Sequence, residues 1–327
     1  MVAAGVASAQ EDVNVLCSVS VGWCEALARA FRSDSGIAVN ITFKDPSDAL
    51  AHVVAEKDDP KHDVWYTSAG EAHLRAAETG LIDEYQSPLT SVLRDFALQQ
   101  GELAKGRAIG TFAAVVGIGF NSKALANKHL PEPHCWTDLA RPEYRNELHF
   151  ANPSSTGVGY RSLATLVQLF GEERAFELMK AIHRNASAYS ITASGAMRAV
   201  ARGEATIAVT MLHDGASEIV NSFPVRLIVP CEGTGYEIGS VAVITKARHP
   251  ANARKFYDWV LTPAAQRLAA STRHFEYPAN RDVPAPAGLP AIDDVRLIRY
   301  DFVKYSASTE HQRLLEKWER DVHALPR

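Results

Sequence analysis

Four short runs of serine and threonine stand just before segments whose residue pattern predicts a helix. They occupy residues 18–22, 67–70, 154–157 and 192–195. A helix N-terminus presents unpaired backbone N–H groups and a positive dipole end, and neighbouring hydroxyls add donors, so such runs can bind an anion without a lysine. Serine and threonine are also ordinary N-caps, and at any single run this structural role is the alternative to anion binding. The candidate anion contacts are Ser18, Ser20, Ser68, Ser154, Ser155, Thr156 and Ser194.

A second set of polar residues follows two predicted strands. His213 and Asp214 come directly after the apolar segment 205–211, and Glu232 and Glu237 flank a glycine-rich turn after segment 225–229. Imidazole and carboxylate groups at the end of a strand can exchange hydrogen bonds with sugar hydroxyls or an amine. The alternatives are that Asp214 caps the next helix and that Glu232 is solvated. We predict that His213, Asp214 and Glu232 contact a ligand.

The common short signatures of hydrolases and nucleotide-binding proteins do not occur in the sequence. An enzyme would need His213 and Asp214 as a general base beside a helix terminus that stabilises an oxyanion. No nucleophile with a partnered base can be identified. The sequence therefore favours a protein that is not an enzyme, and it predicts no cofactor and no bound metal.

The order of the predicted elements favours an α/β fold. Predicted strands at 13–17, 37–43 and 64–66 alternate with predicted helices at 23–32, 46–56 and 70–79, which is the pattern of a parallel sheet with crossover helices. The apolar segment 108–121 and the glycine-rich segment 232–239 are candidate crossings between two such blocks, and the glycines of the first suggest bends within extended chain. If the sheet is doubly wound, the four serine-rich turns lie at the same ends of strands and converge at one crevice.

Composition and charge narrow the class of protein. The chain has 327 residues, 46% of them hydrophobic and 22% charged, and a net charge of −4 with both signs scattered along the sequence. This argues against a nucleic-acid-binding protein and against a largely disordered chain. The small apolar start, ending in Ala7-Ser8-Ala9, resembles a cleavage site, and we interpret residues 1–10 as the remnant of an export signal, the alternative being a disordered N-terminus. The four cysteines, compatible with export, form one or two bridges or remain buried thiols: Cys17, Cys24, Cys135 and Cys231.

Several segments together resemble a known family. They are residues 15–31, 64–71, 136–144 with 151–153, 203–205 and 252–266, and in this order they resemble the periplasmic solute-binding proteins of ABC transporters, of the ferric-iron-binding type. Residues 211–214 and 230–239 look more like the branch that binds hexose phosphates and phosphonates. Iron-binding members use adjacent tyrosines, and none of the ten tyrosines here is next to another.

The resemblance implies a fold and a function. It implies two doubly wound α/β lobes joined by hinge strands, with lobe 1 formed by residues 11–110 and 238–327 and lobe 2 by residues 111–237. It implies an exported, periplasmic receptor that holds a small anionic solute, a sugar phosphate or an organophosphonate, in the cleft between the lobes. The receptor would deliver this solute to the membrane permease and ATPase subunits of an ABC importer. The alternative is a ferric-iron receptor that uses Tyr160, Tyr189, His213 or Glu232.

Overall fold

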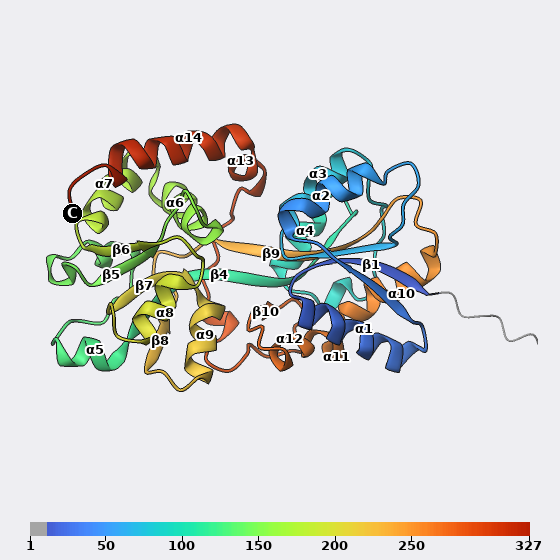
Figure 1. The fold of residues 1–327 in the computed structure, drawn as a ribbon, viewed down its shortest axis with the longest axis horizontal. Helices are drawn as coiled ribbons and strands as arrows, with labels where there is room; N and C mark the ends of the chain where they lie inside the picture. The colour runs from blue at the N-terminus through green and yellow to red at the C-terminus, as the bar shows by residue number, and fades with distance from the viewer. Residues whose placement is uncertain (1–11) are drawn as a thin grey trace, which may run out of the picture. The chain divides into compact units, whose positions relative to one another are not determined.

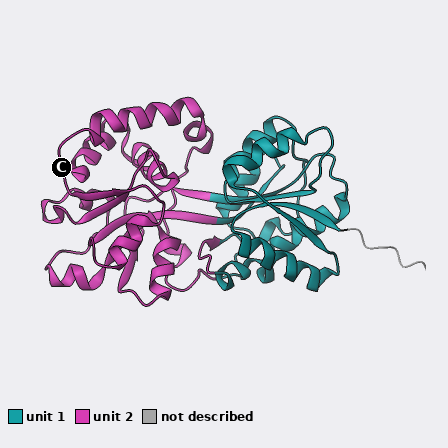
Figure 2. Cartoon of the chain, in the orientation of Figure 1, with its two compact units in different colours: residues 1–112, 238–272, 278–283 teal, residues 113–237, 273–277, 284–327 magenta. Residues whose placement is uncertain are grey.

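The computed structural model describes residues 12–327, which form two compact units (Figure 2). Unit 1 contains the described chain up to residue 112 together with residues 238–272 and 278–283, and unit 2 contains residues 113–237, 273–277 and 284–327. Two strands have residues in both units, β4 (Ile109–Asn121) and β9 (Tyr236–Val243). The proposed export-signal remnant, residues 1–10, lies outside the described residues.

Unit 1 is built on a sheet with the strand order β2-β1-β3-β9 (Figure 1). Strands β1, β2 and β3 are parallel, with Val13 opposite Val39 and Val15 opposite Val64, and β9 pairs antiparallel to β3. Helices α1 and α10 to α12 lie on one side of this sheet and α2, α3 and α4 on the other (Figure 1). The elements of unit 1 are β1 (Val13–Ser18), α1 (Val21–Ser35), β2 (Val39–Phe43), α2 (Pro46–Ala55), β3 (Val64–Thr67), α3 (Gly70–Glu78), a short 3-10 turn (Thr90–Val92), α4 (Asp95–Leu103), α10 (Pro250–Val260), α11 (Pro263–Gln266) and α12 (Leu268–Ser271).

Unit 2 repeats this plan with a second sheet. Its strand order is β8-β4-β7-β5-β6, in which β5 is parallel to both β6 and β7 while β4 runs antiparallel to β7 and β8. Figure 1 shows α6, α7 and α14 on one side of this sheet and α8 and α9 on the other. The elements of unit 2 are α5 (Ser122–Asn127), 3-10 helices η2 (Trp136–Ala140) and η3 (Pro142–Tyr144), β5 (Leu148–Ala151), α6 (Gly157–Phe170), α7 (Glu172–His183), β6 (Ala186–Ser190), α8 (Gly195–Ala201), β7 (Ile207–Met211), α9 (Leu212–Val220), β8 (Val225–Ile228), η4 (Ile292–Asp294), α13 (Phe302–Ser306), α14 (Ser308–Trp318) and the π-helical turn η5 (Glu319–His323); β10 (Tyr277–Pro278) has one residue in each unit and pairs with β4.

The predicted fold class is confirmed, because each unit carries parallel strands with helices on both sides. Local sequence signals fixed several element ends. Helix α1 begins with Ser20 as its N-cap and ends at Gly36, whose φ of 76° is the left-handed conformation that glycine adopts without steric cost.

One local prediction was wrong. The glycines of segment 108–121 do not bend it, since β4 is a single strand of 13 residues. They are needed for close packing instead: a Cβ atom on Gly119 would lie 2.5 Å from the sulfur of Met197, and one on Gly117 would lie 2.3 Å from a methyl carbon of Leu212. Glycine at these two positions lets α8 and α9 approach the strand.

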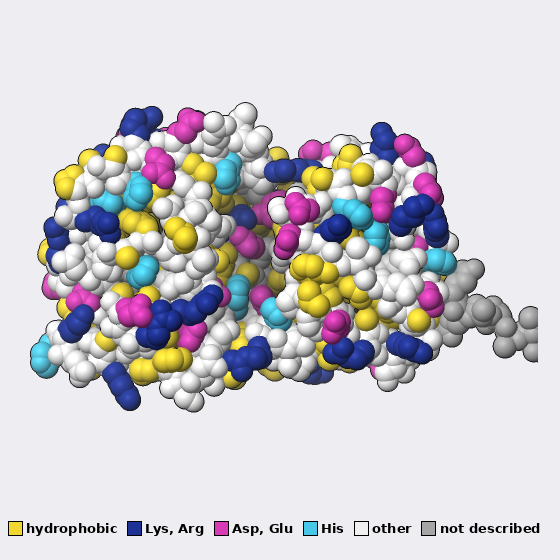
Figure 3. Space-filling model, in the orientation of Figure 1, with side chains coloured by type: hydrophobic (Ala, Val, Ile, Leu, Met, Phe, Trp, Pro, Cys, Tyr) yellow, Lys and Arg dark blue, Asp and Glu magenta, His cyan; other side chains and the backbone are white. Residues whose placement is uncertain are grey.

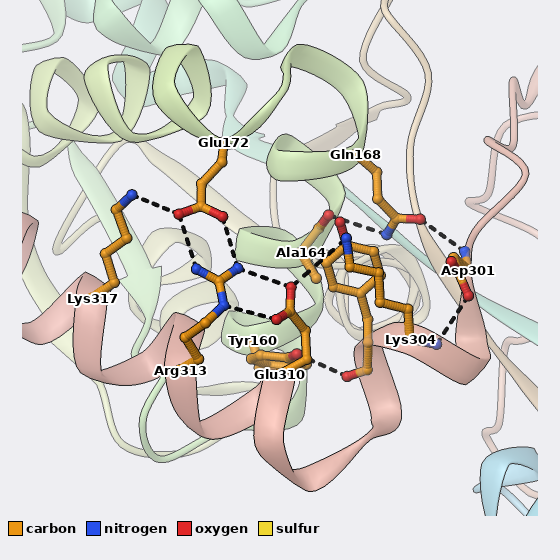
Figure 4. A network of polar contacts seen from close by, with 10 residues as sticks. Tyr160, Ala164, Gln168, Glu172, Asp301, Lys304, Glu310, Arg313 and Lys317 are labelled. Carbon is orange, nitrogen blue, oxygen red and sulfur yellow. Dashed lines mark hydrogen bonds and ion pairs between the residues drawn. The ribbon is translucent and has the colours of Figure 1, made fainter.

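The predicted lobe boundaries need a correction at the C-terminus. Residues 284–327 belong to unit 2 and not to the unit that contains β1 (Figure 2). The reason is a set of contacts between α13 and α14 and the helices α6 and α7 (Figure 4). Glu172 accepts hydrogen bonds from Arg313 at 2.7 and 3.0 Å and from Lys317 at 2.6 Å, and the buried hydroxyl of Tyr160 donates to the carbonyl of Tyr305 at 2.8 Å. These contacts join elements about 140 residues apart in the chain, which no local pattern reveals.

The charged side chains are dispersed, as the sequence predicts. Figure 3 shows Lys and Arg interspersed with Asp and Glu over the visible face of both units. No described helix is long and apolar enough to cross a membrane.

Candidate functional site

The carboxyl ends of three parallel strands bring most of the predicted site residues of unit 2 to one edge of its sheet. Strand β5 ends at Ala151 before Ser154–Thr156, β6 ends at Ser190 before Ser194, and β7 ends at Met211 before His213 and Asp214. Ligands of doubly wound sheets bind outside the carboxyl ends of the strands. This edge is therefore the candidate site of unit 2.

A histidine and two acidic residues form the centre of this site. Nε2 of His213 lies 3.8 Å from Oδ1 of Asp214 and 4.0 Å from Oε1 of Glu276, and Nδ1 of His274 lies 3.9 Å from the same Glu276 oxygen. Glu276 is only 10% exposed. Nδ1 of His213 and Oε2 of Glu276 are buried and have no hydrogen-bond partner among the described residues. Buried polar atoms of this kind are costly unless a ligand or water pairs them.

The pKa values of these groups reflect burial opposed by charge. Burial alone would lower the pKa of His213, but the carboxylates of Glu276, Asp214 and Glu237 outweigh it and raise the pKa above the ordinary value of a histidine. Burial raises the pKa of Asp214, with His213 acting in the opposite direction. Burial also acts to raise the pKa of Glu276, but His213 and His274 prevail and lower it. The site thus holds a histidine biased toward its charged form beside partly buried carboxyl groups.

Helix α6 begins beside a further carboxylate. Oε1 of Glu237 lies 3.6 Å from the position that a Cβ atom on Gly157 would occupy, and 3.6 Å from Nε of Arg161. The Arg161 guanidinium in turn lies 4.6 Å from the centre of the Tyr300 ring. The charge of Glu237 also contributes to the raised pKa of His213, after Glu276 and Asp214. The first turn of α6 and His213 both follow carboxyl ends of strands in the same sheet.

The serine and threonine residues before α6 have separate roles. The hydroxyl of Thr156 accepts from the N–H of Gly159, so Thr156 is the N-cap of α6. The hydroxyl of Ser154 donates to Glu319 at 2.5 Å, and Ser155 is exposed. Before α8, the hydroxyl of Ser194 accepts from Arg198. The capping role that competes with anion binding is therefore present at Thr156, while a ligand contact at all four positions stays a prediction.

In unit 1 the predicted contacts lie at the carboxyl ends of β1 and β3. Ser20 caps α1 by accepting from the N–H of Trp23, and both the N–H and the hydroxyl of Ser68 donate to the carbonyl of Ser18 at 3.2 Å. The hydroxyl oxygen of Ser18 is buried and has no hydrogen-bond partner among the described residues. The Trp23 ring packs beside Tyr66 and Phe112, with ring centres 6.0 and 5.0 Å apart. This edge offers hydroxyls and an aromatic surface.

Glu232 is placed differently from the other predicted acids. Its carboxylate accepts from the N–H of Trp136 at 2.8 Å and from the N–H and hydroxyl of Thr137 at 3.0 Å each. It thereby fixes the start of η2 next to the Cys135–Cys231 disulfide. The two cysteines and Glu232 lie close enough to share a metal ion, but the disulfide leaves no thiolate to bind one. No contact between Glu232 and the His213 cluster is seen among the described residues, and ligand binding by Glu232 stays a prediction.

Sequence reasoning missed three members of the site and did not select a fourth, Glu237, as a ligand contact. Glu276 and His274 come from a short segment before the proline-rich stretch, where no predicted strand or helix drew attention to them. Arg161 lies inside helix α6, and no sequence signal distinguishes it from the other residues of that helix. Glu237 was noticed beside Glu232, but only the start of β9 brings it to α6.

Comparison with known proteins identifies the class. The family model described as bacterial extracellular solute-binding protein matches residues 59–305, so the chain belongs to this family. The resemblance predicted from the sequence, to solute-binding proteins of ABC importers of the ferric-iron-binding type, is confirmed at the level of family and fold.

Three individual proteins illustrate the similarity. A protein of Haemophilus influenzae with no described function is 36% identical over 323 residues, 97% of this chain and 92% of its own length. The periplasmic binding protein AfuA of Actinobacillus pleuropneumoniae, solved with fructose-6-phosphate bound, is 31% identical with a TM-score of 0.76, covering 97% of this chain and 100% of AfuA. The phosphoglycerate transport regulatory protein PgtC of Salmonella typhimurium is 27% identical over 221 residues, 64% of this chain and 53% of PgtC.

Proposed function

We propose that this protein is the extracytoplasmic receptor of an ABC importer for a small phosphorylated solute, a sugar phosphate or an organophosphonate. The observation that carries the proposal is the cluster around His213 in unit 2, with its unpaired buried Nδ1 of His213 and Oε2 of Glu276 beside the first turn of α6. The similarity to AfuA, whose structure contains fructose-6-phosphate, supports it. PgtC supports the same class of solute, although this chain spans only about half of PgtC.

Each part of the cluster suits one part of such a ligand. The N-terminus of α6 and the protonated imidazole of His213 favour the phosphate, because both present hydrogen-bond donors and positive charge. The carboxylates of Asp214, Glu237 and Glu276 accept only, which suits the hydroxyls of a sugar and not a second anionic group. Of the two solute classes, a sugar phosphate, with a phosphate at one end and several hydroxyls at the other, fits this set of groups better.

Binding without covalent chemistry is sufficient for this function. A receptor needs a ligand that binds one conformation better than another, so that loading shifts its conformational equilibrium. The loaded protein then delivers the solute to permease and ATPase subunits in the membrane. The structure contains two disulfides, Cys17–Cys24 and Cys135–Cys231. Disulfides are typical of proteins in an oxidising compartment such as the periplasm.

The test is calorimetric titration with fructose-6-phosphate, glucose-6-phosphate, 3-phosphoglycerate and 2-aminoethylphosphonate. We expect saturable binding of at least one of them, and weaker binding in Asp214→Asn and Glu276→Gln. Asp293→Asn removes one exposed carboxylate elsewhere in unit 2 and serves as the matched control. Failure of all four compounds to bind the ligand-free protein would overturn the proposal.

The same preparation separates the proposal from ferric-iron transport. A ferric phenolate would colour the protein after iron loading. Tyr160 donates its hydroxyl to the Tyr305 carbonyl, and the hydroxyl of Tyr189 lies 2.8 Å from Nδ1 of His183. Burial raises the pKa of both tyrosines, which opposes the phenolate form that iron requires. We therefore expect a colourless protein.

A further inference from the structure

Two histidines and a glutamate meet in unit 1 where α2 leads into β3. Nε2 of His52 lies 3.2 Å from Oε1 of Glu56, and Nδ1 of His62 lies 2.9 Å from Oε2 of the same carboxylate. His52 and Glu56 are four residues apart and therefore project from the same face of the helical turn. The three donor atoms all lie within 4.8 Å of one another.

The cluster is largely shielded from solvent. The side chain of His62 is 7% exposed, and those of His52 and Glu56 are 27% and 21% exposed. Nε2 of His52 is itself buried and has no hydrogen-bond partner among the described residues, although it faces the carboxylate. A buried imidazole nitrogen in this state lacks the partner that water would otherwise supply.

We propose that His52, Glu56 and His62 bind a divalent transition-metal ion of the Zn²⁺ class. Two neutral imidazoles and one carboxylate are a donor set that Zn²⁺ takes in proteins, with a fourth position left for water. Bonds of about 2.0–2.2 Å in tetrahedral geometry place ligand atoms about 3.3 Å apart. The His52 and His62 nitrogens lie 3.2 and 2.9 Å from different oxygens of Glu56, the second as a hydrogen bond, and the donor atoms lie within 4.8 Å of one another. An ion would replace that hydrogen bond, and the side chains would turn by a small amount to share it.

The surroundings orient the carboxylate and balance charge. The N–H of Lys61 donates to Oε2 of Glu56 at 3.2 Å, which fixes one of its two oxygens. The side chains of Lys61 and Arg248 both form ion pairs with Asp59, and neither forms an ion pair with the Glu56 carboxylate among the described residues. A bound ion would give Nε2 of His52 a coordinate bond in place of its 3.2 Å approach to Oε1 of Glu56, which forms no hydrogen bond.

The site is separate from the proposed solute site. His62 precedes β3 and His52 lies near the end of α2, so both are at the amino ends of the parallel strands of unit 1. Ser18 is the last residue of β1 and Ser68 follows β3, so both lie at the carboxyl ends. Metal binding at this site can therefore be tested independently of solute binding.

The experiment is titration of the chelator-treated full chain with Zn²⁺, followed by Co²⁺ absorption. We expect one ion per chain, visible Co²⁺ bands typical of tetrahedral coordination, and affinity lowered at least about tenfold in Glu56→Gln and His62→Gln. His134→Gln removes an exposed histidine of unit 2 and should leave binding unchanged.

Two results would overturn the site. One is the absence of saturable Zn²⁺ binding at micromolar concentration, which would mean that a proton on an imidazole, and not a metal, satisfies Glu56. The other is equal binding in wild type and in Glu56→Gln and His62→Gln, both confirmed as folded by circular dichroism, since other histidines would then hold the ion. Neither result bears on fructose-6-phosphate binding.

Discussion

In both units, turns that follow parallel strands lie at the carboxyl edge of the sheet. The side chains on these turns differ between the two units. In unit 1 the turns after β1 and β3 present serine hydroxyls, largely engaged with neighbouring backbone, beside the ring of Trp23. In unit 2 the turn after β7 carries titratable groups, with His213 within 4.0 Å of Glu276. The two edges therefore differ in their titratable side chains, although both lie at the carboxyl ends of parallel strands.

This difference predicts that the two units contribute unequally to the affinity for the solute. Neutral hydroxyls form hydrogen bonds worth about 1 kcal/mol each, whereas bonds to charged groups are worth about 1.5–3 kcal/mol. We expect unit 2 to set affinity and pH dependence and unit 1 to add smaller contributions.

The two disulfides should stabilise their units unequally. Cys135 and Cys231 are 96 residues apart and close a long loop in unit 2, whereas Cys17 and Cys24 are 7 apart in unit 1. Chain entropy gives about 4.7 kcal/mol for the long loop and about 2.4 kcal/mol for the short one. Denaturant unfolding of the two double alanine variants measures both losses. A larger loss on removal of the short bridge would show that packing of the buried Cys17 and Cys24, and not loop closure, governs the contrast.

Solute binding should depend more on unit 2 than on unit 1. Asp214→Asn should weaken binding of the phosphorylated solute roughly tenfold to a hundredfold, because a charge-assisted bond is lost. Ser68→Ala should weaken it only about threefold to tenfold, since a neutral hydroxyl is lost. Calorimetric titration of both variants with the solute measures the two losses of affinity. Equal effects would remove the proposed dominance of unit 2.

The pH dependence of the two units should have opposite signs. The pKa of His213 in unit 2 is raised, so its contribution to folding stability is complete below about pH 6.5 and is lost as pH rises through the higher folded value. Burial lowers the pKa of His73 in unit 1 to about 3, so stability falls there as pH drops below about 6.5.

Stability measured across pH in two variants separates these histidines. His213→Gln should flatten the loss of stability above pH 6.5, and His73→Gln should flatten the loss below it. Solute affinity should also fall as pH rises through the pKa of His213, because the protonated imidazole favours the anion. An affinity that is unchanged from mildly acid to mildly alkaline pH would exclude His213 as a phosphate contact.

The smallest effect concerns the network that holds α14 to unit 2. Arg313 and Lys317 lower the pKa of Glu172 to about 2, so its contribution is present above the ordinary glutamate value and is lost as pH falls toward 2. The side chain is 31% exposed, so screening limits the cost of Glu172→Gln to about 1 kcal/mol. Urea unfolding at neutral and acid pH checks this. Glu177→Gln, an exposed pair with Lys180 on the same helix, is the control, and an equal loss there would contradict a special role for Glu172.

Much of the fold could be predicted because its signals are local. Alternation of β-branched runs with amphipathic segments placed β1, α1, β3 and α3 to within about three residues, and Gly36 fixed the end of α1. Strand β6 was missed, since Ala186–Ser190 is short and only partly apolar. The C-terminal segment was assigned to the wrong unit because the contacts of Arg313 and Lys317 with Glu172 join distant parts of the chain.

The candidate site divides in the same way. The chemistry of His213 and Asp214 could be inferred because both follow an apolar strand, and the end of a strand is a local feature. Their partner Glu276 lies more than 60 residues further along, and His62 and Glu56 of the proposed metal site lie on opposite sides of a turn with no recognised spacing.

The amino-acid sequence by itself determined the α/β class, the serine-rich helix starts and the identity of the central histidine and aspartate. These follow from residue periodicity and from the preferences of single residues, which act over a few positions. The tertiary structure alone decided which carboxylates surround His213, which unit holds α14 and which histidines share Glu56. Those outcomes depend on burial and on charges brought within a few ångströms of one another, and such distances are set only when the whole chain packs.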